Sequence, residues 1–219
     1  MAGITLGAGV TLGQGITATS TGTPPVLISL KGNNFNGWQL NSAPTIDAVV
    51  GLPAPSYKIT AANQSFKQNF GRTFLNTTIT FDWRPQAGAD CGFLFAQNNT
   101  GNGSFRVSLR MYQIATPYKQ GLGTVDNGGW LYLGDPSYSP IPEVAAIFPT
   151  ANVWYAVKIR VTSGGVCTWY VDGVQQTSTT TISSSYTTAD TVNNWFGFLG
   201  NNLGGTWNVD NITVYSGIV

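Results

Sequence analysis

Strict alternation of apolar and polar residues is the feature that most limits how this chain can fold. In "TTITFDWRP", Ile79, Phe81 and Trp83 occupy every second position, with polar residues between them. The segments "SFRVSLRMY" (residues 104–112) and "VWYAVKIRV" (residues 153–161) alternate in the same way. This period of two predicts half-buried β-strands, and no segment has the spacing of an amphipathic helix. In the last segment we expect one buried face made of Val153, Tyr155, Val157, Ile159 and Val161.

Turn signals separate the expected strands. Asp172-Gly173 lies between "CTWYV" and "VQQTS" and predicts a tight hairpin, because both residues tolerate a positive φ. Many short strands, each with one apolar face, imply two antiparallel sheets packed face to face as a sandwich or jelly roll. The chain has 219 residues, which is enough to bury such a core within one domain.

Composition excludes several classes of function. The chain contains no histidine, which removes Ser-His-Asp and Cys-His catalysis together with histidine metal ligation. A net charge of +1 provides no electrostatic footprint for nucleic acid or for an acidic membrane, so we expect neither as a partner. Cys91 and Cys167 allow one disulfide at most, and free, buried thiols are the favoured reading.

The C-terminal half resembles a known family. The run "NVWYAVKIRVTSGGVCTWYVDGVQQ", the segment "NNWFGFLG" and the closing "NVDNITVYSG" are similar to the laminin-G/concanavalin-A-like jelly roll. The resemblance covers about residues 70–217, and its motifs are structural. It implies an all-β, concanavalin-A-like jelly-roll sandwich of two antiparallel sheets, and it says little about a ligand.

The acidic residues do not match those of a glucanase of this fold. Such enzymes have an acidic E-x-D-x-E strand, and retaining chemistry needs two carboxyl groups about 5 Å apart. This chain has a single glutamate, Glu143, and its eight aspartates form no acid-x-acid pair. We therefore expect that the chain is not an enzyme and has no catalytic residues.

No cofactor is expected, and calcium is the alternative that stays open. Hard cations take oxygen ligands, commonly several carboxylates. Asp90 with Asn98 and Asn99, or Asp126 with Asn127, could contribute such ligands, but no contiguous D-x-D-x-D loop exists. Aspartate and asparagine in turns more often bond to the local backbone. The sequence leaves the identity of any metal ligand unknown.

A candidate carbohydrate patch follows from two of the expected strands. The polar face of "SFRVSLRMY" holds Arg106, Arg110 and Tyr112, and "GGWLYLG" directs Trp130 and Tyr132 to one side. If these strands are neighbours, the five side chains form an aromatic and basic surface suited to a glycan. The alternative is that loop 134–150 or a neighbouring subunit covers Trp130 and Tyr132.

Residues 1–22 are predicted to form an extended assembly arm that precedes a jelly-roll domain over residues 23–219. The arm has no charged residue, and apolar residues occupy its even positions from 4 to 18 except at Gln14, among them Ile4, Leu6, Val10, Leu12 and Ile16. The same residues also fit a six-residue repeat, but one repeat coil cannot bury its own core. An apolar, uncharged strand needs a partner sheet. "GITLGAGVTLG" resembles the N-termini of tailed-bacteriophage structural proteins.

Together these patterns favour a virion structural protein, either a capsid decoration or a tail or fibre component. Its arm would join copies of itself or other virion proteins by β-addition, and its jelly roll would face outward and could contact cell-surface glycans. With no signal peptide, it would be assembled in the host cytoplasm. The alternatives are an extracellular lectin or adhesin, and a secreted filament subunit that assembles by donor-strand exchange.

Overall fold

The computed structural model describes residues 24–97, 105–112, 121–124, 150–176, 179–182, 186, 194–200 and 205–219. All regular structure in these ranges is β-strand, and every pair of neighbouring strands is antiparallel. Because the described part holds no helix, it offers no helical segment able to cross a membrane. The predicted arm, residues 1–22, lies outside the described residues, so its boundary stays a prediction.

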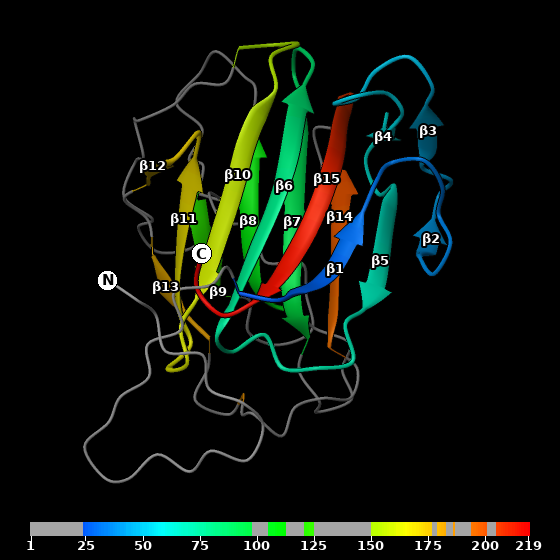
Figure 1. Ribbon diagram of the computed structural model, residues 1–219. Coiled ribbons are helices and arrows are strands. Elements are labelled where there is room, and N and C mark those ends of the chain that lie inside the picture. The colour runs from blue at the N-terminus through cyan, green and yellow to red at the C-terminus, as the bar shows by residue number, and fades with distance from the viewer. Residues whose placement is uncertain are drawn as a thin grey trace, which may run out of the picture.

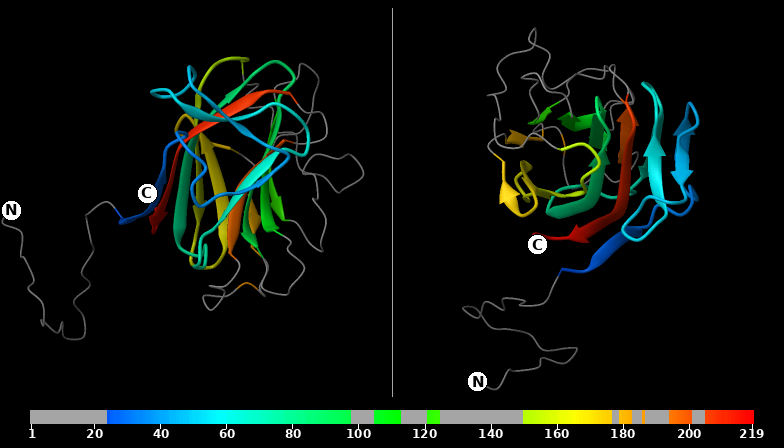
Figure 2. Two further views of the ribbon diagram at one scale, coloured as in Figure 1. Left: turned by 90° about the vertical axis from the view of Figure 1, so that its right-hand side faces the viewer. Right: turned by 90° about the horizontal axis from the view of Figure 1, so that it is seen from above.

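The strands form two sheets, which Figure 2 shows as separate layers. Sheet A has nine strands, with β12-β11-β10-β6-β15-β4-β3 in order, β1 beside β15, and β13 beside β11. Its strands are β1 (Val26–Leu30), β3 (Thr45–Asp47), β4 (Ser56–Ile59), β6 (Thr77–Pro85), β10 (Tyr155–Val161), β11 (Val166–Val171), β12 (Val174–Gln175), β13 (Thr180–Thr181) and β15 (Trp207–Ser216).

Sheet B has six strands in the order β2-β5-β14-β7-β8-β9 and lies behind sheet A in Figure 1. Its strands are β2 (Gln39–Asn41), β5 (Ser65–Asn69), β7 (Asp90–Gln97), β8 (Phe105–Tyr112), β9 (Gly121–Thr124) and β14 (Trp195–Gly200). The predicted sandwich of two antiparallel sheets is confirmed.

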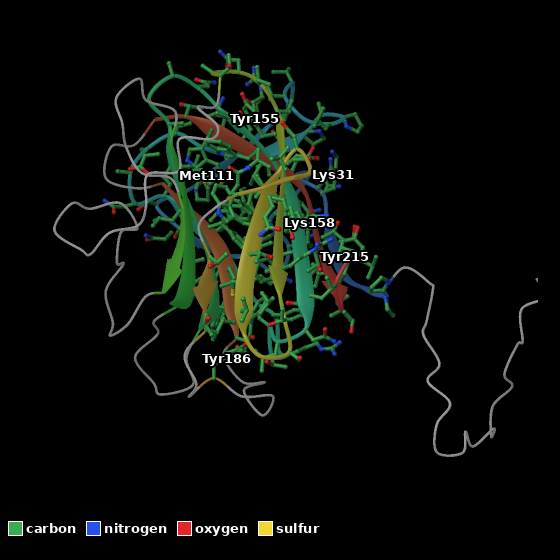
Figure 3. All side chains as sticks on the ribbon, turned by 90° about the vertical axis from the view of Figure 1, so that its left-hand side faces the viewer. Lys31, Met111, Tyr155, Lys158, Tyr186 and Tyr215 are labelled. Carbon is green, nitrogen blue, oxygen red and sulfur yellow. The ribbon has the colours of Figure 1, made fainter. Side chains whose placement is uncertain are left out.

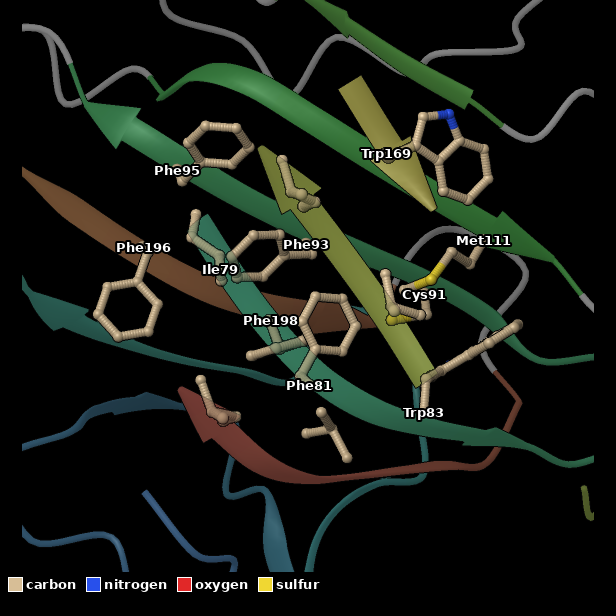
Figure 4. Close-up of a cluster of buried hydrophobic side chains, with 14 of the residues drawn as sticks. Ile79, Phe81, Trp83, Cys91, Phe93, Phe95, Met111, Trp169, Phe196 and Phe198 are labelled. Atoms are coloured by element: carbon tan, nitrogen blue, oxygen red, sulfur yellow. The ribbon is translucent and has the colours of Figure 1, made fainter. Parts of the chain in front are cut away.

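Aromatic side chains from both sheets fill the space between the layers (Figure 4). Phe81 of sheet A lies 5.0 Å from Phe93 and 5.0 Å from Phe198 of sheet B, measured between ring centroids. These three rings are at most 1% exposed. A buried Phe side chain contributes about 1.5–3 kcal/mol relative to an exposed one, so this cluster is a main source of stability. Because these rings point into the core, the cluster also determines which face of each strand points outward.

The predicted hairpin is confirmed at Asp172-Gly173. The two residues join β11 to β12 with φ values of 49° and 81°. A type I′ turn requires a positive φ at both central positions, which an Asp-Gly pair supplies at low cost. The carboxylate of Asp172 also accepts a hydrogen bond of 2.8 Å from the Ala156 backbone N–H, which ties the turn to β10.

Two details of the strands differ from the sequence prediction. Val153, expected on the buried face, is 43% exposed, because β10 begins only at Tyr155. Thr78, expected on the polar face, is fully buried. Its hydroxyl donates to the Gly217 carbonyl at 2.8 Å and accepts from the Val219 N–H at 3.1 Å. The C-terminal segment therefore covers this part of β6.

Both cysteines are free and buried, Cys91 on β7 and Cys167 on β11. Burial raises the pKa of the Cys91 thiol well above its ordinary value and that of Cys167 to about 12. Because the thiolate is the reactive form, neither cysteine suits nucleophilic chemistry in the folded protein.

Candidate functional site

Strand register defines an outer face of sheet B, turned away from the core. Gly197 of β14 pairs with Lys67 of β5 on one side and with Leu94 of β7 on the other. Leu199 pairs with Ser65 and Gly92 in the next row. Side chains alternate along a strand, and Phe66, Phe93, Phe196 and Phe198 point into the core. The positions between them therefore form the outer face.

A pocket opens on this face between β5 and β14, which lie side by side in Figure 1. Its volume is about 180 Å³, and its lining residues are Asn41, Ser65, Phe66, Lys67, Leu94, Gly197 and Phe198. A Cβ atom at position 197 would lie 2.5 Å from the Phe66 carbonyl oxygen and 2.7 Å from the Lys67 Cβ. Only glycine therefore permits the close approach of β14 to β5 at this point.

An aromatic ring and a cation flank the pocket. The Lys67 ammonium lies 5.1 Å from the centroid of the half-buried Trp195 ring, which is cation–π distance. Trp195 packs with Leu94 and Leu199 in a second hydrophobic cluster, separate from the main core. A half-buried ring beside amide, hydroxyl and ammonium groups can bind a ligand with one apolar face and several hydroxyls.

The predicted carbohydrate patch is only in part within the described residues. Arg106, Arg110 and Tyr112 belong to β8, and the register places Arg110 opposite Gly92 and Tyr112 opposite Asp90. These are outer-face positions, because Met111 between them is buried in the core. In the described sheet, β8 lies between β7 and β9. The "GGWLYLG" segment lies outside the described residues, so the condition that it neighbours this strand stays untested.

Other predicted site residues lie outside the described residues. These are Trp130 and Tyr132 of the patch, the arm residues, Asn98 and Asn99 beside Asp90, and Asp126 with Asn127. Asp90 itself is buried. Among the described residues, no three acidic or cysteine side chains come together as a metal site would require. The calcium alternative therefore stays a prediction.

Sequence reasoning missed Lys67 and Trp195. In "NNWFGFLG" both alternating sets are apolar, with Phe196 and Phe198 in one and Trp195 and Leu199 in the other. A strand that carries apolar residues on both of its faces indicates a second contact surface besides the core. The sequence therefore held a signal for an apolar outer surface at this strand. The pairing with Lys67 depends on the β5–β14 register, which no local pattern shows.

The outer face of sheet A brings together two carboxylates that lie far apart in the sequence. Asp82 of β6 and Asp210 of β15 are cross-strand neighbours, next to a register shift in β15. Asp210 is fully buried and accepts hydrogen bonds from the backbone N–H groups of Gly32 at 3.1 Å, Leu52 at 2.9 Å and Asn211 at 2.9 Å. The Lys31 ammonium completes this set as its ion-pair partner.

Asp82 lies at the edge of this network and accepts a hydrogen bond of 2.6 Å from the Asn211 side chain. Burial raises the pKa of Asp82, and the negative charge of Asp210 adds to the shift, although the Asn211 hydrogen bond opposes it. A second ion pair joins Lys58 to Asp47 at 3.0 Å. These polar groups connect loops to the sheet, and their acceptors already have partners.

Comparisons with known proteins agree on the fold. No protein-family model and no curated protein sequence matches the chain. The structure is similar to the carbohydrate esterase vb_24B_21 from the Shiga toxin-encoding bacteriophage phi24B, with a TM-score of 0.58 and 13% identity over 89% of this chain and 100% of that one. It is also similar to the metal-free carbohydrate recognition domain of Emp46p, with a TM-score of 0.53 and 10% identity over 88% and 98% of the two chains.

A third similar structure is the binding domain of Paraclostridial Mosquitocidal Protein 1, with a TM-score of 0.53 and 17% identity. It matches 89% of this chain but 49% of that one. At these identities the likeness shows the fold alone, a lectin-like jelly roll of two antiparallel sheets. The predicted concanavalin-A-like architecture is confirmed, and the predicted resemblance of the arm stays a prediction.

The comparisons contradict the prediction that the chain is not an enzyme, because a phage carbohydrate esterase has this fold over its whole length. The prediction rested on missing histidines and on the absence of an acid-x-acid pair, which remove particular mechanisms rather than enzymatic chemistry in general. Spacing along the chain also misses carboxylates that the sheet brings together. Asp82 and Asp210, as cross-strand neighbours, are such a pair.

Proposed function

We propose that this chain binds carbohydrate on the outer face of sheet B, at the pocket between β5 and β14. The observation that carries the proposal is the half-buried Trp195 ring, which lies outside the main core beside polar pocket residues. The apolar side of a pyranose would pack against this ring. Asn41, Ser65 and Lys67 supply donors and acceptors for sugar hydroxyls.

The size of the pocket supports recognition of one sugar unit of a longer chain. Its volume of about 180 Å³ is below the roughly 300–1,000 Å³ typical of pockets for drug-sized ligands. The outer-face strand positions of Arg110 and Tyr112, on the same side of the sheet, would extend the surface for neighbouring units. The carbohydrate recognition domain and the carbohydrate esterase among the similar structures support this ligand class.

The setting we propose is a virion, on which the chain would decorate the capsid or form part of a tail or fibre. The phage origin of one similar protein and the predicted arm with Ile4, Leu6, Val10, Leu12 and Ile16 support this setting. The arm leads into β1, which pairs only with β15 among the described residues. Copies of the chain or other virion proteins would accept the arm by β-addition.

A glycan array tests the binding proposal, with the wild-type protein, Trp195→Ala and a control, Tyr170→Ala. Tyr170 is a partly exposed aromatic residue on the outer face of sheet A, where it contacts Lys158 and Arg160. We expect Trp195→Ala to weaken binding by roughly tenfold or more, since it removes a large aromatic contact surface. The control should bind as the wild type does. Binding by no saccharide, or equal binding by Trp195→Ala, would contradict the proposal.

A lectin and a carbohydrate-active enzyme both need this binding step, so turnover requires its own measurement. Acetate released from acetylated oligosaccharides reports esterase action, and new reducing ends report glycoside cleavage. If either product appears with the wild type and falls with Trp195→Ala, the same face serves catalysis.

Deletion of residues 1–22 tests the role of the arm. We expect a soluble, folded protein that no longer assembles, measured by size-exclusion chromatography and electron microscopy of the full-length and truncated chains. A truncated protein that unfolds or aggregates would show that the arm belongs to its own core instead.

A further inference from the structure

We infer that the saccharide bound at this face is acidic and that the Lys67 ammonium recognises its anionic group. This inference rests on the proposed carbohydrate-binding function and names the class of ligand. The evidence is a difference in partners between Lys67 and the lysines that form ion pairs.

Lys67 differs from the lysines that stabilise the fold. Lys31 pairs with Asp210, and Lys58 pairs with Asp47. Within the described ranges, no carboxylate lies at salt-bridge distance from Lys67, whose ammonium faces the Trp195 ring instead. Lys67 also lines the pocket. Among the described residues, the cation is thus held at the proposed ligand site without an opposite charge.

The position of Lys67 also disfavours a neutral sugar. A neutral ring that packs on the same side of Trp195 must displace the ammonium and offers no charge in return. A carboxylate or sulfate can bind the displaced ammonium by a charge-assisted hydrogen bond, so contact with the ring and neutralisation of the cation occur together. The geometry therefore discriminates by charge as well as by shape.

The test uses an array of matched pairs that differ in charge. Oligogalacturonate is compared with its methyl ester, sialylated lactosamine with the asialo form, and a sulfated saccharide with its desulfated form. The proteins are the wild type, Lys67→Gln, Lys67→Arg and a control, Lys158→Gln. Lys158 is a partly exposed lysine over Tyr170 on the outer face of sheet A, so its substitution makes the same change in charge away from the site.

We expect the wild type to bind acidic members of these pairs and to lose binding as the salt concentration rises. Lys67→Gln should weaken acidic binding by roughly tenfold, the size of one lost hydrogen bond to a charged group. Lys67→Arg should keep most of the affinity, and Lys158→Gln should keep all of it. The carboxylate and sulfate pairs show which anionic group is preferred.

Two results would overturn the inference. Equal binding of neutral and acidic members, or acidic binding that Lys67→Gln leaves unchanged, would show that Lys67 does not select the ligand, while carbohydrate binding itself would stand. Binding of no saccharide would overturn the inference together with the proposed function.

Discussion

The outer faces of the two sheets use their polar residues differently. On sheet A, the buried Asp210 has partners in three backbone N–H groups and Lys31, and Asp47 pairs with Lys58. Arg160 donates to the Tyr170 hydroxyl at 3.0 Å and to the Val219 carbonyl at 2.7 Å. Figure 3 shows side chains of both sheets, with Lys158 on β10 marking sheet A and Met111 on β8 marking sheet B. The polar groups of this face mostly bond to one another.

On sheet B, the outer face instead places apolar side chains next to a cation. Trp195, Leu94 and Leu199 form a cluster of their own, and Lys67 lies over the ring of Trp195. Gly92 and Gly197 provide positions without side chains in the middle of the sheet. The comparison teaches that the polar network of sheet A fixes loops, whereas the outer face of sheet B keeps an apolar cluster and a cation beside a pocket, where we propose that a saccharide binds.

The largest expected effect is on stability and comes from sheet A. Asp210→Ala leaves the Lys31 ammonium and three backbone N–H donors without their acceptor, and the N–H of Gly32 among them is buried. Breaking a buried charge network in this way costs about 3–5 kcal/mol. Urea unfolding measures the loss, with Lys67→Gln as the control from sheet B, for which we expect a change within about 0.5 kcal/mol. Similar losses for the two variants would remove the contrast between the faces.

The next effect is expected at the floor of the sheet B pocket. Gly197→Ala places a Cβ 2.5 Å from the Phe66 carbonyl oxygen, so β5 and β14 must move apart. Overpacking of this kind costs about 1–3 kcal/mol, and we expect glycan binding to fall as well. Gly164→Ala is the matched control, because its nearest atom, the Thr162 hydroxyl oxygen, would lie 3.9 Å away. Unfolding and binding curves that match the control would show that the site tolerates a wider strand spacing.

The smallest effect that we expect is a change in the pH dependence of stability at Asp82. Its pKa is raised above the ordinary value of 3.8, so the folded state binds the proton more tightly than the unfolded state. The resulting stability is complete below pH 3.8 and disappears as the pH rises through the raised pKa. Asp82→Asn should remove this decline in urea unfolding curves measured across the acidic range.

Asp47, also on sheet A, is expected to change stability with pH in the direction opposite to Asp82. Burial alone would raise its pKa, but hydrogen bonds from Lys58, Val49 and Asn208 lower it below 3.8. Its contribution to stability is therefore present above pH 3.8 and is lost as the pH falls through the lowered value. If Asp47→Asn and Asp82→Asn change the pH profile in the same direction, the assignment of the two carboxylates is wrong.

Local patterns predicted most of the fold. Alternation in "TTITFDWRP" predicted β6 with Ile79, Phe81 and Trp83 toward the core, and Asp172-Gly173 predicted the β11–β12 hairpin. Both signals lie within a few residues of chain, where strand period and turn geometry act directly. The residue at which a strand begins was harder to predict. Val153 was expected on a buried face, but it is exposed because β10 begins only at Tyr155.

The candidate site could not be predicted in the same way, because its residues come from separate strands. Lys67 meets Trp195 only through the β5–β14 register, and Asp82 meets Asp210 only through the β6–β15 register. Register depends on how the whole sheet closes and not on the local sequence. The outer-face positions of Arg110 and Tyr112 follow from alternation, but their neighbours across the sheet do not.

The most direct test of the central claim follows the tryptophan indole N–H signals in a ¹H–¹⁵N NMR titration with a saccharide that binds on the array. The chain has seven tryptophans, and Trp195→Phe assigns the signal of Trp195. We predict that the Trp195 signal shifts in proportion to the bound fraction, while those of the buried Trp83, Trp169 and Trp207 keep their positions. A saccharide that binds and leaves the Trp195 signal unchanged would contradict the placement of the site on sheet B.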